Sequence, residues 1–361
     1  MKKYTVVDLF CGAGGLSKGF LDAGFNVVLG VDFDEPALRT FEANHGSAKA
    51  MKLDLFNHDN IFEIKKYLED NKIQLDVLVG GPPCQGFSLA GKREENDERN
   101  VLYSAMVKTA KELRPKIVVL ENVPGMLKLY DGKGAKRIIN DFTELGYKMS
   151  AEILYAPNFG VPQIRKRVVF VGLLNGKKEF EYPISKIKPE NYITCEEAIS
   201  DLPSLENDND YSLDKIREYI MEPTNDYQKQ MRKNSIKVFN HFPTKHAQKT
   251  IENIAKIPDG GNYKDLPVGE SEKFKYHESL TRYNSKKPSL TIDTGHRTHF
   301  HYKYNRIPSV RENARLQSFP DDFIFYGSKQ QQYKQVGNAV PPLLGKAVAE
   351  KIKEVLDNEE V

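Results

Sequence analysis

The first half of the chain alternates short runs of β-branched residues with segments of helical periodicity. This alternation is typical of a parallel sheet with helices on both faces, because consecutive parallel strands need a helical crossover. Turn-forming residues bound the apolar runs, which favours buried strands. The expected strands are Tyr4–Leu9, Asn26–Val31, Leu75–Val79, Lys116–Leu120 and Val168–Leu173. The expected helices are Gly14–Ala23, Glu35–His45, Ile61–Asp70, Val101–Leu113 and Gly134–Leu145. The pattern therefore predicts an α/β fold.

The alternation stops at about Tyr182, and a polar segment rich in Asn, Lys, Tyr and Pro continues to Pro308. Within it, Thr194–Glu197 forms a capping box that predicts a short helix. A helical pattern returns at Val310, and Leu343–Leu356 has amphipathic spacing. We therefore expect a large domain made of residues 1–184 and 327–361, an inserted smaller domain at 185–308, and a hinge segment at 309–326.

Positive charge is concentrated in residues 211–310, which hold 18 lysines and arginines against 11 aspartates and glutamates. Six of the eight histidines lie in the same segment. A basic segment of this kind either meets a polyanion, such as a nucleic acid, or forms a solvated surface without a partner. Charge alone does not separate these two interpretations.

The chain has three widely separated cysteines without CxxC spacing: Cys11, Cys84 and Cys195. This spacing predicts neither a disulfide framework nor a zinc site. His296, His299 and His301 lack a cysteine or carboxylate at ligand spacing, so we expect no metal. No apolar run approaches the roughly 18 residues that span a membrane. A reducing, cytoplasmic setting fits these features.

A glycine-rich turn, Asp8–Gly15, separates the first expected strand from the first helix. Glycines there let a ligand approach the backbone and the helix N-terminus closely. Asp32, at the end of the second strand, is suited to bind ribose hydroxyls, and Phe33 could stack on adenine. A nicotinamide dehydrogenase would carry a similar turn, although Ser17 departs from the G-x-G-x-x-G pattern. A tight turn without a ligand is the structural alternative.

A second turn, Gly80–Ser88, is more specific because it contains Pro82-Pro83-Cys84-Gln85 directly after a buried strand. Cys84 should therefore stand at the carboxyl edge of the sheet, where α/β folds place their sites. The two prolines stiffen the backbone that presents the thiol. An inert buried cysteine is the usual alternative, but turn formers rather than core residues surround Cys84.

These two turns, together with six further motifs in the same order, resemble the cytosine-C5 DNA methyltransferase family. The further matches are Asp32-Phe33, Asp54 in Leu53–Leu55, Glu121-Asn122-Val123, Gln163–Arg167, Arg311–Gln317 and Gly337–Pro342. Asn313 departs mildly, because a cysteine is common at that place. The resemblance implies a Rossmann-like S-adenosylmethionine-dependent methyltransferase domain. The family's target-recognition domain would then correspond to the inserted basic segment.

The resemblance also assigns roles to individual residues. It implies catalytic roles for Cys84, Glu121, Arg165 and Arg167. It implies S-adenosylmethionine contacts from Phe10, Gly12, Gly14, Gly15, Asp32, Phe33, Asp54, Pro83, Asn338 and Val340. DNA contacts are expected from Gln85, Ser88, Lys92, Arg93, Arg282 and Arg297, with His299 and Lys286 as further candidates. The polar stretch Ser88–Asn100 is interpreted as a lid over the DNA.

The implied reaction begins with the Cys84 thiolate, which adds to C6 of cytosine so that C5 can attack the methyl donor. A protonated Glu121 would donate to N3, Arg167 would hold Glu121 and the cytosine O2, and Arg165 would meet phosphate. Because a stacked base cannot expose both ring faces, the cytosine must flip out of the duplex. A cytosine-C5 RNA methyltransferase and a catalytically silent DNA-binding protein are the alternatives. The long basic insertion favours double-stranded DNA.

The chain size and the resemblance favour a monomeric modification enzyme of a restriction–modification system. Its cognate endonuclease would be a separate protein. Tyr263, Tyr283 and Tyr302 are as consistent with core positions as with DNA contacts, and Cys195 is interpreted as structural.

Overall fold

The computed structural model describes residues 3–83, 102–128, 132–185, 187–267, 280–295 and 298–358. The predictions for Cys84, Gln85, Ser88, Lys92, Arg93 and Arg297, and for the lid at Ser88–Asn100, lie outside these residues. The chain divides into two compact units. The first contains residues Met1–Tyr155, Lys166–Ile184 and Pro342–Val361, and the second contains Ala156–Arg165 and Ser185–Pro341.

The first unit is built on a seven-stranded sheet with the order β3-β2-β1-β4-β5-β7-β6. Its strands are β1 (Thr5–Leu9), β2 (Asn26–Asp32), β3 (Lys49–Lys52), β4 (Val77–Gly80), β5 (Ile117–Asn122), β6 (Tyr147–Tyr155) and β7 (Lys166–Leu174). The first five strands pair in parallel, whereas β7 runs antiparallel to both β5 and β6. The sheet is therefore mixed, and the expectation of a parallel sheet holds only for β1 to β5.

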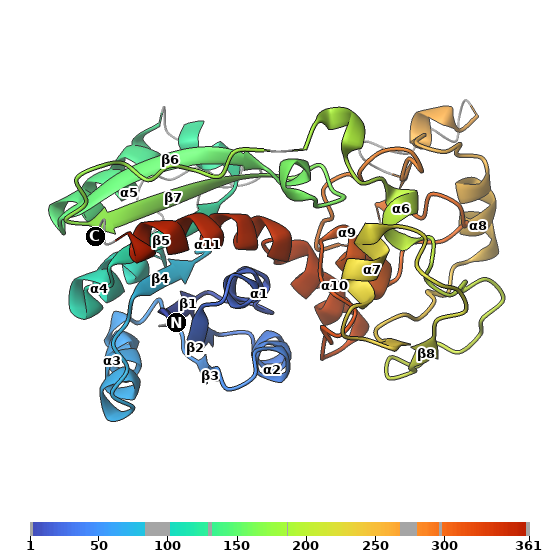
Figure 1. The fold of residues 1–361 in the computed structure, drawn as a ribbon. Coiled ribbons are helices and arrows are strands. Elements are labelled where there is room, and N and C mark those ends of the chain that lie inside the picture. Colours follow the sequence, from blue (N-terminus) through green and yellow to red (C-terminus); the bar gives the residue numbers. More distant parts are fainter. Residues whose placement is uncertain are drawn as a thin grey trace. The chain divides into compact units, whose positions relative to one another are not determined.

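Helices form two layers on this sheet (Figure 1). They are α1 (Gly15–Asp22), α2 (Glu35–Asn44), α3 (Ile61–Asp70), α4 (Leu102–Leu113), α5 (Lys133–Glu144) and α11 (Pro342–Asp357). On one face α1 packs against α11, and on the other α4 packs against both α3 and α5. The core consists of buried aliphatic and aromatic side chains from the central strands and the helices on the sheet, among them Val7, Leu29, Leu78, Val118 and Phe170.

The second unit has little sheet. It contains α6 (Cys195–Ile199), α7 (Asp226–Arg232), α8 (Gln248–Ala255), α9 (Val310–Leu316) and α10 (Lys329–Asn338). Two short strand pairs, β8 (Arg217–Glu218) with β9 (Lys237–Val238) and β10 (Thr281–Arg282) with β11 (His299–Phe300), complete it. The capping box at Thr194 and Glu197 is present at the start of α6. Tyr283, Tyr302 and Cys195 are buried, so all three belong to the core.

Charged side chains supply much of the interior of the second unit. The Arg315 guanidinium lies 2.9 Å from Asp201 Oδ1 and 2.6 Å from Asp321 Oδ2, and all three side chains are fully buried. Arg306 donates two hydrogen bonds of 2.7 Å to the Glu312 carboxylate. Buried charges of this kind require paired partners, because water no longer solvates them.

The second unit includes Ala156–Arg165, which we assigned to the large domain, and also residues 327–341, which we assigned to the same domain. The latter segment includes α10, which packs against α9 inside the second unit. Tyr333 and Val336 of α10 are buried, and the Tyr333 hydroxyl donates to the Pro308 carbonyl at 2.7 Å.

No helix in the described parts of the chain is both long enough and apolar enough to cross a membrane.

Candidate active site

The glycine-rich turn folds into a tight loop between β1 and α1. Phe10, Gly12 and Gly14 have positive φ angles of 60°, 53° and 89°. Only glycine adopts such angles without a steric cost, and Gly14 is the N-cap of α1. The loop is closed by hydrogen bonds from Gly14 N to Cys11 O (2.8 Å) and from Cys11 N to Val31 O (3.1 Å). These two bonds close the turn that leads into α1, and its contact with a cofactor stays a prediction.

Asp32 lies at the end of β2 and organises the same loop. Its Oδ2 accepts from Gly12 N at 2.8 Å, and its Oδ1 accepts from Asp34 N at 2.9 Å. Burial raises the pKa of this carboxyl group, although the backbone hydrogen bonds oppose the shift. Phe33, the next residue, exposes 63% of its surface. An exposed aromatic ring beside a fixed carboxylate can bind an adenosine group by stacking and by hydroxyl hydrogen bonds.

Asp54 lies in the turn that follows the edge strand β3. Leu53 N donates to Asp32 O at 3.0 Å, which places the turn after β3 beside the end of β2. The Asp54 side chain is exposed, and its Oδ1 accepts from Phe56 N at 2.9 Å. The first unit therefore brings together the glycine loop, Asp32, Phe33 and Asp54, and this donor and acceptor set fits an adenosine-containing cofactor.

A buried carboxyl group below the loop was not singled out from the sequence. Asp8 is 1% exposed and accepts from Ser17 Oγ at 2.6 Å. Burial raises the pKa of Asp8 to about 7, and the hydrogen bond from Ser17 opposes this shift. Cys11 is also buried, and burial raises the pKa of its thiol well above the usual value. An aspartate inside an otherwise apolar strand was the sequence signal for this group.

Glu121 and Arg167 form the charged pair of the candidate catalytic site. Glu121 lies near the end of β5, and Arg167 lies on the adjacent antiparallel strand β7. Arg167 Nε is 2.7 Å from Glu121 Oε1, and both side chains are largely buried. This contact is the one expected between them, while their parts in the reaction stay predictions.

The backbone that leads to Cys84 lies against this pair. β4 and β5 are parallel neighbours, with Gly80 opposite Leu120. Asn122 Nδ2 donates to Pro82 O at 3.1 Å and so fixes the proline segment. A Cβ atom added to Gly81 would lie 3.2 Å from Glu121 Oε2. Gly81 and Pro82 are therefore held close to Glu121, and the cofactor contact expected of Pro83 stays a prediction.

Arg165 does not have the surroundings expected of a phosphate-binding or catalytic residue. It is 1% exposed, and its Nη2 donates to Gly337 O at 3.1 Å and to Ala339 O at 3.0 Å. Its guanidinium thus holds the turn around Asn338, and we correct its assignment to a positioning role. Within the second unit Asn338 is exposed and Val340 is half-buried, and their cofactor contacts stay predictions.

Arg282 is also wrong as a predicted DNA contact. The side chain is 5% exposed, and its guanidinium donates to three main-chain carbonyls at 3.1 Å or less: Ile257 O, Ile254 O and His301 O. It therefore stabilises the interior of the second unit. His299 is likewise buried and stacks on Tyr283, whereas Lys286 is exposed and paired with Glu196.

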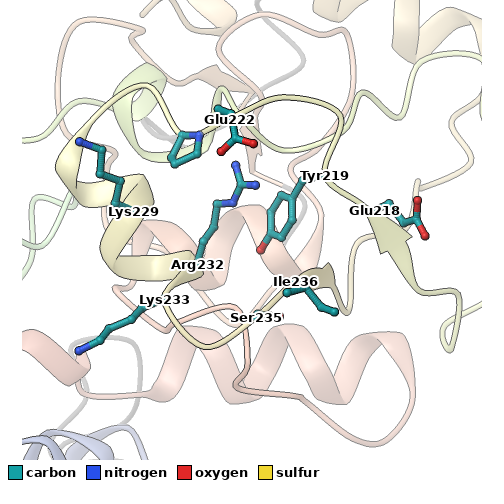
Figure 2. Close-up of a pocket in the computed structure, with 9 residues that line it drawn as sticks. Glu218, Tyr219, Glu222, Lys229, Arg232, Lys233, Ser235 and Ile236 are labelled. Carbon is teal, nitrogen blue, oxygen red and sulfur yellow. The ribbon is translucent and has the colours of Figure 1, made fainter.

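A pocket of about 530 Å³ lies elsewhere in the second unit, and none of the predicted site residues lines it (Figure 2). The Arg232 guanidinium stacks 3.6 Å from the centre of the Tyr219 ring and donates to Met221 O at 2.8 Å. Because none of the predicted site residues lines this pocket, we make no functional assignment for it.

Comparisons with known proteins agree with the geometry of the first unit. A family model described as C-5 cytosine-specific DNA methylase matches residues 4–354. The type II methyltransferase M.DdeI of Desulfomicrobium norvegicum is 36% identical over 379 residues, covering 98% of this chain and 89% of that protein. The type II methyltransferase M1.HphI of Haemophilus parahaemolyticus is 37% identical over 360 residues, covering 98% and 88% respectively.

Solved structures show the same architecture. A prophage-encoded protein from E. coli, described as a DNA modification methyltransferase, superposes with a TM-score of 0.81 at 25% identity, covering 98% of this chain and 100% of that one. The S. pombe Dnmt2 methyltransferase, at 16% identity and a TM-score of 0.58, shares the fold. From the family match over nearly the whole chain and the two relatives above 30% identity, we conclude that this protein belongs to the C-5 cytosine-specific DNA methylase family.

Proposed function

We propose that this cytosine-C5 DNA methyltransferase modifies one cytosine within a short double-stranded DNA sequence through a covalent intermediate on Cys84. The observation that carries the proposal is the Glu121–Arg167 pair, held beside the Gly81–Pro83 segment that leads to Cys84. A general acid next to a cysteine-bearing turn is the arrangement that addition to a cytosine ring requires. Family membership is inconsistent with the nicotinamide dehydrogenase considered above.

The methyl donor would be S-adenosylmethionine, held by the Gly12–Gly15 loop, Asp32, Phe33 and Asp54. When bound, it supplies an electrophilic methyl group on a sulfonium. The fit is supported by the Asp32 carboxylate beside the exposed Phe33 ring and by the glycine loop at the start of α1. The DNA would supply the cytosine, flipped from the duplex so that both ring faces are accessible.

In the proposed reaction the Cys84 thiolate forms a bond to C6, while Glu121 donates its proton to N3. The C5–C6 π electrons become available at C5, which would take up the methyl group while the bond from that methyl to the donor's sulfonium sulfur breaks. This step would leave the donor as a neutral thioether. A base then removes the C5 proton, the Cys84–C6 bond breaks, and N3 returns its proton to Glu121. Arg167 orients Glu121 throughout, because its guanidinium is fixed by the carboxylate and by the Lys166 carbonyl at 2.7 Å.

Bisulfite sequencing tests this proposal directly. Random-sequence DNA is incubated with S-adenosylmethionine and either the wild-type protein or Cys84→Ala. We expect protected cytosines confined to one short motif with the wild type, and none with Cys84→Ala. Absence of protection by a folded, cofactor-bound wild type would refute the DNA substrate, and RNA would be tested next.

We further propose that this modification protects host DNA from a cognate endonuclease. DNA carrying the methylated motif should then resist a restriction endonuclease that cuts at that sequence. Cutting at the same rate as unmodified DNA would contradict the protective role and leave the methyl transfer itself untouched.

A further inference from the structure

His45 directly follows α2, and its imidazole ring lies against the glycine loop of the first unit. The ring is buried, with only 3% of the residue exposed, and stacks on Phe41 at a centroid distance of 4.1 Å. Its Nε2 is 2.9 Å from Gly14 O, and its Nδ1 is 2.6 Å from Phe41 O. Both ring nitrogens therefore face carbonyl oxygens, which only accept hydrogen bonds.

A neutral imidazole carries one N–H, so it can donate to only one of these two carbonyls. Burial lowers the pKa of His45, and the nearby Lys18 charge acts in the same direction. The carbonyl contacts and the Asp22 charge oppose that shift without reversing it. At neutral pH a single proton is therefore shared between two sites, and its position decides whether Gly14 O, which accepts from Lys18 N at 2.8 Å, receives a second hydrogen bond.

The path of the loop depends on this ring. A Cβ atom added to Gly14 would lie 2.2 Å from His45 Cε1, so the imidazole fills the space that a side chain would need. Gly14 caps α1, and its neighbour Gly12 is tied to Asp32 by a hydrogen bond of 2.8 Å. A hydrogen bond from His45 to Gly14 O would thus give the loop a further tertiary contact, besides the one that Asp32 makes with Gly12 N.

We propose that His45 is a positioning residue for the methyl donor. With its proton on Nε2, it adds a second hydrogen bond to the Gly14 carbonyl, beside that from Lys18 N, and keeps the Gly12–Gly15 loop in the shape that receives S-adenosylmethionine. This inference rests on the proposed function, because it assumes that the loop binds that cofactor.

Binding of S-adenosylmethionine by His45→Phe and His45→Gln tests the inference. Phenylalanine keeps the stacking on Phe41 but has no donor, whereas glutamine restores one donor. We expect His45→Phe to raise both the dissociation constant and the KM for the cofactor about five- to tenfold, the effect of one lost hydrogen bond, with kcat changed less than twofold. His45→Gln should recover part of the loss. His246→Gln, a histidine substitution in the second unit, is the control.

The outcomes separate the two proposals. A wild-type protein that does not bind S-adenosylmethionine would contradict the proposed function. A wild type that binds, together with a folded His45→Phe that binds equally well, would overturn the role of His45 alone. A purely structural residue would lower the melting temperature of the variant without moving the KM.

A measurement on the wild type covers the case in which His45→Phe does not fold. Nitrogen-15 NMR of histidine side chains distinguishes the two tautomers, with the His45 signal assigned by its loss in His45→Gln. A proton on Nε2 in the cofactor-bound protein, in the neutral ring or in an imidazolium, supports the inference. A neutral ring protonated only on Nδ1 would overturn it.

Discussion

At the scale of single residues, the contact between Glu121 and Arg167 gives the sharpest expectation. Replacement of Glu121 by Gln keeps the size and one acceptor for Arg167 Nε, but it removes the proton donor proposed for cytosine N3. General acid catalysis typically contributes 10²- to 10⁴-fold, so we expect kcat to fall by about that factor. Affinity for S-adenosylmethionine, measured by equilibrium binding, should change little. Glu112→Gln, on the surface of α4, is the control.

A Glu121→Gln enzyme with kcat within threefold of the wild type would show that Glu121 is not the acid. Loss of cofactor binding in this variant would instead indicate that the pair with Arg167 holds the strand ends together.

The Gly12–Gly15 loop, Asp32 and Glu121 lie at strand ends, as motif matching predicted, while their roles in binding and catalysis stay predictions. Motif matching failed for Arg165 and Arg282, whose guanidinium groups are consumed by main-chain carbonyls inside the protein. Sequence context alone does not indicate whether an arginine faces water, phosphate or backbone. His45 carried no motif at all, because its importance comes from the carbonyl oxygens that surround it.

At the scale of elements, the sequence identified the central strands and missed the two edges of the sheet. β3 has no buried residue, and β6 alternates buried with exposed residues irregularly. Edge strands carry polar side chains, so they lack the apolar runs that identify central strands. The antiparallel direction of β7 was not predictable either, because its continuous buried run has the residue pattern of the parallel central strands.

The α9 element yields a stability prediction. Arg315 donates to both oxygens of Asp321, at 2.7 and 2.6 Å, in a site with no exposure. Asp321→Ala removes one of the two carboxylates that pair with Arg315 and leaves this buried cation with only Asp201. Loss of a partner from a buried ion pair typically costs about 3–5 kcal/mol of unfolding free energy. Asp226→Ala, which removes an exposed pair with Lys229, should cost less than about 1 kcal/mol. Urea titration of both variants checks this expectation, and equal midpoints would contradict it.

At the scale of the whole molecule, buried histidines should make the protein sensitive to mild acid. His241 is fully buried between Ser309 Oγ (2.8 Å) and Pro203 O (2.7 Å), and burial lowers its pKa to about 4. Burial likewise lowers the pKa of His301 to about 3. Glu312 would favour the charged form of His301, but its carboxylate is already neutralised by two hydrogen bonds from Arg306. Both rings are therefore neutral in the folded protein at pH 5.5.

The unfolded chain binds protons at these histidines first, since the pKa of an unfolded histidine is about 6.5. Their stabilising contribution is complete above that pH and is lost as the pH falls from about 6.5 towards the folded values. At pH 5.5 the loss should be about 1 kcal/mol for each histidine. The lowered pKa values of His45 and His246 act in the same direction. The buried carboxylates Glu312 and Asp321 have lowered pKa values, so their stabilising contribution is present above about pH 4.3 and is lost only as the pH falls below it.

Melting temperatures at pH 7.5 and 5.5 measure this effect without interference from those carboxylates. Asp8, whose pKa burial raises to about 7, gains its proton in the folded protein over the same pH range and opposes the histidine loss. The histidine contribution is therefore read from the difference in pH dependence between the wild type and a histidine variant. His241→Gln can still donate to the Pro203 carbonyl but has no ring to protonate, so its melting temperature should depend less on pH, even if it is lower at both values. Gln330→Ala, at an exposed position without a titratable group, should show the full wild-type dependence. Stability falls on acidification only through groups that bind more protons in the unfolded chain than in the folded protein. An identical pH dependence in His241→Gln and the wild type would therefore mean that His241 is already protonated in the folded protein.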